Sequence, residues 1–264
     1  MSLSQSLFDL TGKTALVTGG SSGLGAYFAE VLCEAGAKVA IVARRTEKLE
    51  EVATLVRSKG GDVRTKTCDI VDAERVAEVV DELWNELGRI DILVNNAGTV
   101  GDGGFVPEKL PHAVFGETIQ TNLVGLWTCS QEVGKRMLSD GMGGSIINIT
   151  SVMGMGGAAD HPLAYQTSKA GVINLTRNLA CSWADRGVRV NAIAPAYFPS
   201  EMTGPYLAVP GFEPYVQNAT PMGRLGELNE LAGPLLMLAG DAGSYMTGAL
   251  IPVDGGYSSG VGHS

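Results

Sequence analysis

The chain has 264 residues, 45% of them hydrophobic and 18% charged, with a formal net charge of −9 at pH 7. Length and composition predict one globular domain, residues 1–264, and the charge argues against nucleic acid or an anionic membrane as partner. The N-terminal residues do not read as a targeting signal and no apolar run reaches membrane-spanning length, so a cytoplasmic location is expected. Four scattered cysteines without a C-x-x-C spacing predict reduced thiols, no disulfide framework and no metal site.

The predicted elements alternate along the chain between strand and helix. This alternation predicts an α/β fold, a doubly wound parallel sheet of about seven strands with helices on both faces. The expected strands are residues 13–18, 38–43, 63–67, 90–94, 145–150, 188–193 and 249–253. The expected helices are residues 26–35, 47–58, 72–87, 110–138, 163–184 and 227–238.

Two stretches rich in Gly or Pro, residues 101–108 and 194–220, fall outside this alternation. Long loops in a compact fold are usually functional, so residues 194–220 are expected to form a lid over the substrate. In a doubly wound sheet the ligand lies beyond the carboxyl ends of the strands. Both stretches follow such ends, and the chemistry is therefore expected at one edge of the sheet.

A glycine-rich turn follows the first expected strand and precedes the first helix. Glycines allow a tight turn and let backbone N–H groups approach a pyrophosphate, while the helix directs its positive end at the same charge. The turn therefore predicts a dinucleotide site. The expected contacts from it are Gly19, Ser21, Ser22, Gly23, Leu24 and Gly25.

Tyr165 and Lys169 are four residues apart in the expected helix 163–184, so they share one face of it. A free phenol has a pKa of about 10, and a neighbouring ammonium group favours the phenolate. The pair is therefore a candidate acid/base for carbonyl or alcohol chemistry. An isolated Tyr-x-x-x-Lys also occurs on plain surfaces, so the interpretation depends on the motifs around it.

Six short motifs in a fixed order supply that context. They are residues 18–25 (TGGSSGLG), 95–98 (NNAG), 121–122 (TN), 149–151 (ITS), 165–169 (YQTSK) and 190–195 (VNAIAP). Together they resemble the short-chain dehydrogenase/reductase family, over nearly the whole chain from about residue 10 to residue 256. The resemblance implies a Rossmann fold and a nicotinamide cofactor.

The resemblance also implies four catalytic roles. Tyr165 would exchange the proton at the substrate oxygen, and Ser151 would hydrogen-bond that oxygen. Lys169 would lower the pKa of Tyr165 and hold the nicotinamide ribose, while Asn122 would anchor a water that links Lys169 to solvent. Ser151 could also be an ordinary cap, and Asn122 could simply satisfy backbone groups.

Further cofactor contacts follow from the same resemblance. Those implied are Asp69 at the adenine with its neighbour Ile70, Asn96, Ala97 and Gly98 at the adenosine ribose, and Pro195 and Thr203 on the nicotinamide side, besides Tyr165 and Lys169. Asn95 is interpreted as mostly structural, and Asp72 as a helix N-cap.

The cofactor type depends on residues 43–45. A NAD site usually places an acid at the end of the second strand, where this chain has Ala43. Arg44 and Arg45 follow, and guanidinium groups suit a 2′-phosphate, to which Ser21 and Ser22 could add hydrogen bonds. NADP(H) is therefore expected, with NAD(H) the less favoured alternative.

The substrate side is expected to include Ser151, Met153, His161, Tyr197, Phe198 and Tyr206. The methionine and aromatic side chains among them favour a hydrophobic or medium-sized ketone, although such side chains are also common in an ordinary core. His161 is more simply explained as a loop histidine without a role. Ala196 stands where the family usually has glycine. If that glycine has a positive φ, Ala196 implies a different lid path or strain.

The function expected from the whole chain is an NADPH-dependent carbonyl reductase or secondary-alcohol dehydrogenase for a small-molecule ketone or alcohol. A 3-oxoacyl thioester (acyl-carrier) reductase and a sugar or polyol dehydrogenase are alternatives. A non-catalytic NADP-sensing protein is a further alternative, which the presence of Ser151, Tyr165 and Lys169 disfavours.

A homotetramer is also expected, since the family pairs its long helices between subunits. Helices 110–138 and 163–184 carry apolar residues around much of their circumference, which predicts a second covered face besides the one on the sheet. The residues that suggest a second apolar face are Leu126, Trp127, Val133, Leu175, Leu179 and Trp183.

Overall fold

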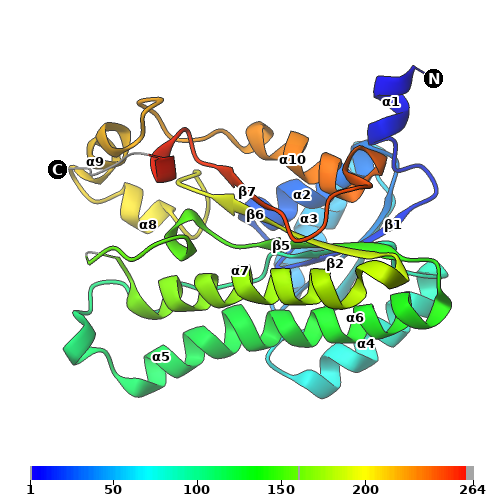
Figure 1. Cartoon of the computed structure of the whole chain (residues 1–264), viewed down its shortest axis with the longest axis horizontal. Helices are drawn as coiled ribbons and strands as arrows, with labels where there is room; N and C mark the ends of the chain where they lie inside the picture. The colour runs from blue at the N-terminus through cyan, green and yellow to red at the C-terminus, as the bar shows by residue number, and fades with distance from the viewer. Residues whose placement is uncertain (1, 160, 260–264) are drawn as a thin grey trace.

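A computed structural model describes residues 2–159 and 161–259 of the chain. Its strands form one seven-stranded parallel sheet in the order β3-β2-β1-β4-β5-β6-β7 (Figure 1). The strands are β1 (Thr14–Thr18), β2 (Lys38–Ala43), β3 (Val63–Thr67), β4 (Ile92–Asn95), β5 (Gly144–Ile149), β6 (Val188–Pro195) and β7 (Leu250–Val253). The strand order reverses between β1 and β4, which confirms the predicted doubly wound sheet.

Helices cover both faces of this sheet (Figure 1). They are α1 (Leu3–Phe8), α2 (Gly23–Glu34), α3 (Thr46–Ser58), α4 (Ala73–Leu87), α5 (His112–Ile119), α6 (Leu126–Asp140), α7 (Leu163–Trp183), α8 (Gly204–Leu207), α9 (Phe212–Ala219) and α10 (Ala232–Ala239). One hydrophobic core lies under α2, α3 and α10, and a second lies under α4, α6 and α7. Strand β1 is buried throughout because alternate residues, Val17 and Leu16, enter the two different cores.

Three elements differ from the predicted pattern. The single helix expected at 110–138 is instead α5, a π-helical segment Gln120–Gly125, and α6. The loop expected at 194–220 contains the short helices α8 and α9. Helix α1 was not predicted, because six residues held by a capping box between Ser2 and Gln5 leave no helical period to read.

The contacts of α7 do not support the argument from an exposed apolar face. Leu126, Val133, Leu179 and Trp183 are all buried within the single chain. The ring of Trp183 lies over Gly134, where an added Cβ would be 2.7 Å from the ring. Folding of the single chain thus already buries four of the six side chains that suggested a subunit interface. The tetramer stays an expectation that rests on the family resemblance alone.

The four cysteines are free thiols in different surroundings. Burial raises the pKa of Cys33 and of Cys68 to about 11, and it raises the pKa of Cys129 further. Cys181, near the end of α7, is exposed. Across residues 2–159 and 161–259, no helix is long and apolar enough to cross a membrane, and no three His, Cys, Asp or Glu side chains gather to hold a metal ion.

Candidate active site

The carboxyl ends of β1, β4, β5 and β6 bring the predicted site residues to one edge of the sheet. The glycine turn follows β1, Asn96 follows β4, Ser151 follows β5, and Pro195 ends β6. Strands β1 and β4 are neighbours at the point where the strand order reverses. This is the position at which open α/β sheets bind ligands.

The glycine turn is packed against the segment that follows β4. Gly19 has φ +68°, and an added Cβ would lie 2.8 Å from Cα of Ala97. At Gly25 an added Cβ would be 2.2 Å from the carbonyl oxygen of Gly19. Nδ2 of Asn96 donates to the carbonyls of Thr18 at 3.1 Å and Gly19 at 3.3 Å. The turn therefore needs glycines for close backbone packing, and the hydrogen bonds from Asn96 hold its shape.

Asn95 and Asp72 both make structural contacts of the kind expected. Nδ2 of Asn95, a buried side chain, donates to Oγ of Ser130 at 2.8 Å and to Oδ1 of Asn148 at 2.9 Å. The Asp72 carboxylate caps α4 by accepting from the backbone N–H of Arg75.

Tyr165, Lys169 and Ser151 are brought together where α7 passes the end of β5. Nζ of Lys169 lies 5.6 Å from the centroid of the Tyr165 ring and donates to the carbonyl of Ile149 at 2.9 Å. Only 4% of Lys169 is exposed. Oγ of Ser151 accepts from the backbone N–H of Met153 at 3.2 Å, so Ser151 also starts a 3₁₀ turn. The structural and the catalytic interpretation of Ser151 are therefore compatible.

The ionisation of the pair differs from the expected direction. Partial burial raises the pKa of Tyr165 to about 12, with a hydrogen bond from Ser151 acting against the rise and nearby Tyr206 adding to it. Burial lowers the pKa of Lys169 to about 8. Taking a phenolate out of water is costly, so the pKa of Tyr165 in this structure lies above its ordinary value. The lowering of this pKa by Lys169 stays a prediction.

Asn122 lies in the π-helical segment Gln120–Gly125 and is fully buried. Its Oδ1 accepts from the backbone N–H of Thr99 at 2.7 Å, and its Nδ2 donates to the carbonyl of Thr99 at 2.8 Å. Nδ2 also lies 3.1 Å from Oγ of Ser168. Asn122 therefore ties the loop after β4 to α7. A π-helical turn is frequent at functional sites, but its extra residue leaves no periodicity that sequence alone reveals.

The two arginines after β2 occupy different positions. Nη2 of Arg45 donates to Oγ of Ser22 at 3.0 Å and lies 3.3 Å from Oγ of Ser21. Arg44 instead approaches Asp69, at 3.8 Å between Nη1 and Oδ2, and is largely exposed. Arg45, rather than Arg44, therefore stands beside the glycine turn.

Asp69 and Ile70 follow β3. Oδ1 of Asp69 accepts from the backbone N–H of Val71 at 3.1 Å, while its other oxygen faces Arg44. Ile70 is buried, and its side chain fills the space beside Gly125, where an added Cβ would be 2.9 Å away. The Asp69 carboxylate thus lies partly exposed between Val71 and Arg44, whereas the side chain of Ile70 packs in the core.

The segment after β6 is held in place by aromatic contacts. The Tyr197 ring meets Phe212 and Tyr257 edge to face, each at 5.7 Å between centroids, and Tyr206 lies 5.9 Å from Phe212. His161 reaches the same group, with Nε2 3.1 Å from the Tyr197 hydroxyl. These contacts connect four parts of the chain beside Tyr165.

Three other residues of this segment bear on the predictions. Phe198 is 3% exposed, belongs to the core under α2 and packs on Gly226, so it lies in the core rather than along an open substrate surface. Oγ1 of Thr203 donates to the carbonyl of Phe198 at 2.6 Å, which fixes the turn before α8. Among the described residues only glycines have positive φ, so Ala196 adopts an ordinary backbone conformation without strain.

Asp102 is a buried acid that the sequence analysis did not single out. It is 1% exposed and lies in the loop after β4. Its Oδ2 accepts from the backbone N–H of Ala164, next to Tyr165, at 2.6 Å. Its Oδ1 has no hydrogen-bond partner among the described residues. The neighbouring Gly103 touches Tyr206, whose hydroxyl would be 2.5 Å from an added Cβ.

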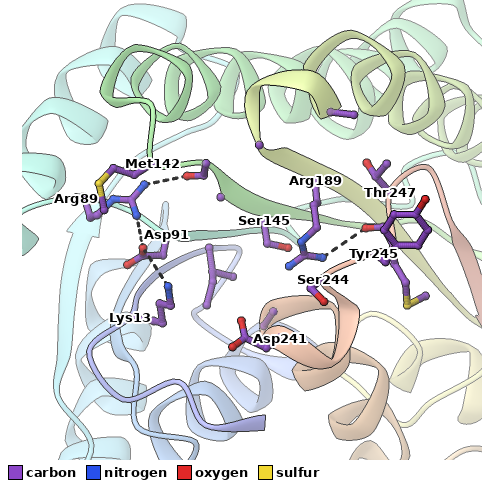
Figure 2. Close-up of a pocket in the computed structure, with 18 residues that line it drawn as sticks. Lys13, Arg89, Asp91, Met142, Ser145, Arg189, Asp241, Ser244, Tyr245 and Thr247 are labelled. Carbon is purple, nitrogen blue, oxygen red and sulfur yellow. Dashed lines mark hydrogen bonds and ion pairs between the residues drawn. The ribbon is translucent and has the colours of Figure 1, made fainter. Parts of the chain in front are cut away.

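A cavity of about 530 Å³ lies at the opposite, amino edge of the sheet. Figure 2 shows Lys13 and Arg89 both directed at Asp91, with Arg189 further along the same cavity. Arg189 donates to the carbonyls of Leu238 at 2.8 Å and Gly243 at 2.9 Å. None of the predicted catalytic or cofactor residues lines this cavity.

Comparison with known proteins agrees with this geometry. A family profile described as enoyl-(acyl carrier protein) reductase matches residues 19–258. The chain is 39% identical over 255 residues to galactitol 2-dehydrogenase of Rhizobium johnstonii, covering 96% of this chain and 98% of that protein. It is 39% identical over 256 residues to a rhamnolipid-biosynthesis 3-oxoacyl-[acyl-carrier-protein] reductase of Pseudomonas aeruginosa, covering 95% and 98%. The crystal structure of a gluconate 5-dehydrogenase from Burkholderia cenocepacia with NADP and tartrate superposes with a TM-score of 0.92, at 32% identity, covering 98% of this chain and 100% of that one.

Proposed function

The chain belongs to the short-chain dehydrogenase/reductase family, whose oxidoreductases act on alcohol and carbonyl groups with NAD(P), and we propose that it is an NADPH-dependent carbonyl reductase or secondary-alcohol dehydrogenase. The observation that carries this proposal is the placement of Tyr165, Lys169 and Ser151 around one point at the end of β5.

Each of the three side chains contributes one chemical step. The Tyr165 hydroxyl delivers a proton to the substrate oxygen, and Ser151 Oγ bonds the same oxygen and orients it. Burial raises the pKa of Tyr165 to about 12, so the phenol carries its proton at neutral pH and is ready to donate it to a carbonyl oxygen. Lys169 stabilises the phenolate that remains. Since burial lowers the pKa of Lys169 to about 8, Lys169 can itself exchange a proton near neutral pH.

The glycine turn and its surroundings fit a dinucleotide. Close packing within the chain requires glycine at Gly19 and Gly25 of the turn before α2, and the first N–H groups of α2 lie beside this turn. NADPH held there would supply the hydride. Arg45 with Ser21 and Ser22 offers hydrogen-bond donors to a 2′-phosphate, which supports NADP(H) over NAD(H).

Asp102 favours a hydroxylated substrate as a second candidate, in line with the polyol and sugar-acid names of two relatives. A buried carboxylate oxygen without a partner is unfavourable, and a substrate hydroxyl next to the reacting carbon would satisfy it. The hydrogen bond from the backbone N–H of Ala164 holds Asp102 beside the first turn of α7. Ala164 directly precedes Tyr165 in the sequence. The 3-oxoacyl thioester alternative rests on the second relative named above.

A substrate panel followed by NADPH absorbance tests the proposal. The panel comprises butan-2-one, 3-hydroxybutan-2-one, an aryl ketone, a 3-oxoacyl thioester and a keto-sugar, each with wild type and Tyr165→Phe. Oxidation of NADPH that requires Tyr165 is expected with at least one ketone. A preference for 3-hydroxybutan-2-one over butan-2-one would select the hydroxylated class. Tight NADPH binding without turnover of any member would favour a sensing protein instead.

A further inference from the structure

Glu201 makes a contact that neither the family motifs nor the catalytic geometry explain. It lies between β6 and α8, 156 residues from Arg45 in the sequence. Its Oε1 and Oε2 accept from Nη1 and Nη2 of Arg45, both at 2.6 Å. The same Nη2 also donates to Ser22. A carboxylate from the lid segment is thus bound by the very arginine that stands beside the glycine turn.

The carboxylate uses the part of Arg45 that a phosphate would use. Two parallel N–H groups of a guanidinium bind a carboxylate or a phosphate in the same two-pronged geometry. With Glu201 in place, a 2′-phosphate at Ser21 and Ser22 would meet a negative charge instead of free donors. Arg45 cannot present these two groups to both anions at once.

The contact is also open to exchange. The side chains of Arg45 and Glu201 are 48% and 55% exposed, so water and ligands reach both. Exposed ion pairs hold weakly, and a dianionic phosphate is a stronger partner for a guanidinium than one carboxylate. The hydrogen bonds from Arg45 lower the pKa of Glu201 to about 2, so the carboxylate is charged at every pH at which the enzyme is tested.

We propose that Glu201 is a cofactor-specificity residue that competes with the 2′-phosphate of NADPH for Arg45. The competition weakens NADPH binding and leaves NADH, which has no 2′-phosphate, almost unaffected. Glu201 therefore sets how strongly the chain prefers NADPH. This inference rests on the proposed NADPH function and refines it.

Equilibrium binding of NADPH and NADH to Glu201→Gln, followed by cofactor fluorescence, tests the competition without any substrate. The variant keeps the size of the side chain and removes its charge. We expect the Kd for NADPH to fall about tenfold, the scale of one lost charge–charge competitor, and the Kd for NADH to change by less than about twofold. Glu213→Gln on α9 is the matched control, since it removes the same charge from the same segment at a carboxylate that bonds Gln217.

Arg45→Leu, alone and combined with Glu201→Gln, separates this inference from the proposed cofactor. If Arg45→Leu leaves NADPH affinity unchanged, the NADPH proposal fails and the competition fails with it. If Arg45→Leu weakens NADPH but Glu201→Gln does not strengthen it, only the competition fails. Equal weakening of both cofactors by Glu201→Gln would show instead that the ion pair closes over bound cofactor, and would overturn the inference. In the double variant the gain from Glu201→Gln is expected to disappear.

Discussion

Charged side chains have different kinds of partner at the two edges of the sheet. At the amino edge, Arg189 donates to the carbonyls that end α10 and the turn after it, and Arg89 pairs with Asp91 and Asp140. In both guanidiniums the two Nη nitrogens bond to groups of the chain itself, whereas the buried Nε of Arg89 has no partner among the described residues. That edge has a cavity of about 530 Å³ and no chemistry assigned to it.

At the carboxyl edge, two buried polar side chains lack, within the described part of the chain, the partners that buried charged groups usually have. Oδ1 of Asp102 has no partner among the described residues, although the side chain is buried. Lys169 is buried with a carbonyl as its hydrogen-bond acceptor and no carboxylate ion-paired to it among the described residues. Among the described residues, a buried lysine without an ion pair and a buried carboxylate oxygen without a partner therefore mark the edge of the sheet that holds the proposed active site.

Tyr165→Phe is expected to have the largest effect at the carboxyl edge. Removing the hydroxyl removes the proton donor, and kcat for the best ketone should fall by about a hundredfold or more. The Kd for NADPH should stay within about twofold of wild type, because Phe keeps the ring and binding does not need the proton. Steady-state kinetics and equilibrium binding measure the two quantities. A kcat near that of wild type would remove Tyr165 from the mechanism.

Lys169→Met should change how stability depends on pH. In the folded protein Lys169 loses its proton near pH 8, whereas in the unfolded chain it does so near pH 10.5. Between these values the unfolded chain binds more protons, so the free energy of unfolding rises with pH, by up to about 3 kcal/mol. Below pH 8 the full cost of burying the charge applies.

Urea unfolding of wild type and Lys169→Met at pH 7.5 and pH 10 measures this effect. Between these two pH values, the increase in the free energy of unfolding should be up to about 3 kcal/mol smaller in Lys169→Met than in wild type. Lys135→Met, which alters an exposed lysine, should show the same increase as wild type. Equal pH dependence in wild type and Lys169→Met would mean that Lys169 is not destabilised by burial.

Arg189→Ala tests the amino edge. Loss of the guanidinium leaves the carbonyls of Leu238 and Gly243 without these donors, so unfolding should become easier by about 1–3 kcal/mol. The kcat/KM of the folded variant should remain within about twofold of wild type. Arg186→Ala, at an exposed arginine bonded to Ser182, is the control for charge removal. A large loss of kcat/KM in folded Arg189→Ala would show that the two edges are coupled.

Ala196→Gly should have the smallest effect. Ala196 has an ordinary backbone conformation, so glycine relieves no strain and only adds freedom to the unfolded chain. The free energy of unfolding should fall by about 0.4–1 kcal/mol with kcat/KM nearly unchanged. Thermal unfolding measures the shift. A more stable glycine variant would indicate that the lid path at Ala196 is strained after all.

Sequence predicted what depends on local periodicity and short spacing. All seven strands were expected within a few residues of their bounds, because buried apolar runs separated by helical patterns mark a parallel sheet. The i,i+4 spacing placed Tyr165 beside Lys169, and the glycine turn before α2 was placed by its residue types. Both signals lie within a few neighbouring residues.

Sequence could not predict contacts between distant segments or the balance of opposing energies. The pairs Asp102 with Ala164 and Arg45 with Glu201 join residues 62 and 156 positions apart, without a pattern that links them. The pKa of Tyr165 depends on how deeply the phenol is buried, which spacing does not reveal. Likewise, the apolar residues of α6 and α7 could belong to a core or to an interface until their packing was known.

The exposed position of Cys181 makes it possible to test by chemical labelling whether copies of the chain associate. The thiolate is the reactive form of cysteine, and burial keeps Cys33, Cys68 and Cys129 protonated at neutral pH. A maleimide dye should therefore attach once per chain, at exposed Cys181, without any engineered substitution. Cys181 lies on α7, so a second copy of the chain packed on that helix would cover it. Slower labelling at higher protein concentration would show that this surface is covered by self-association.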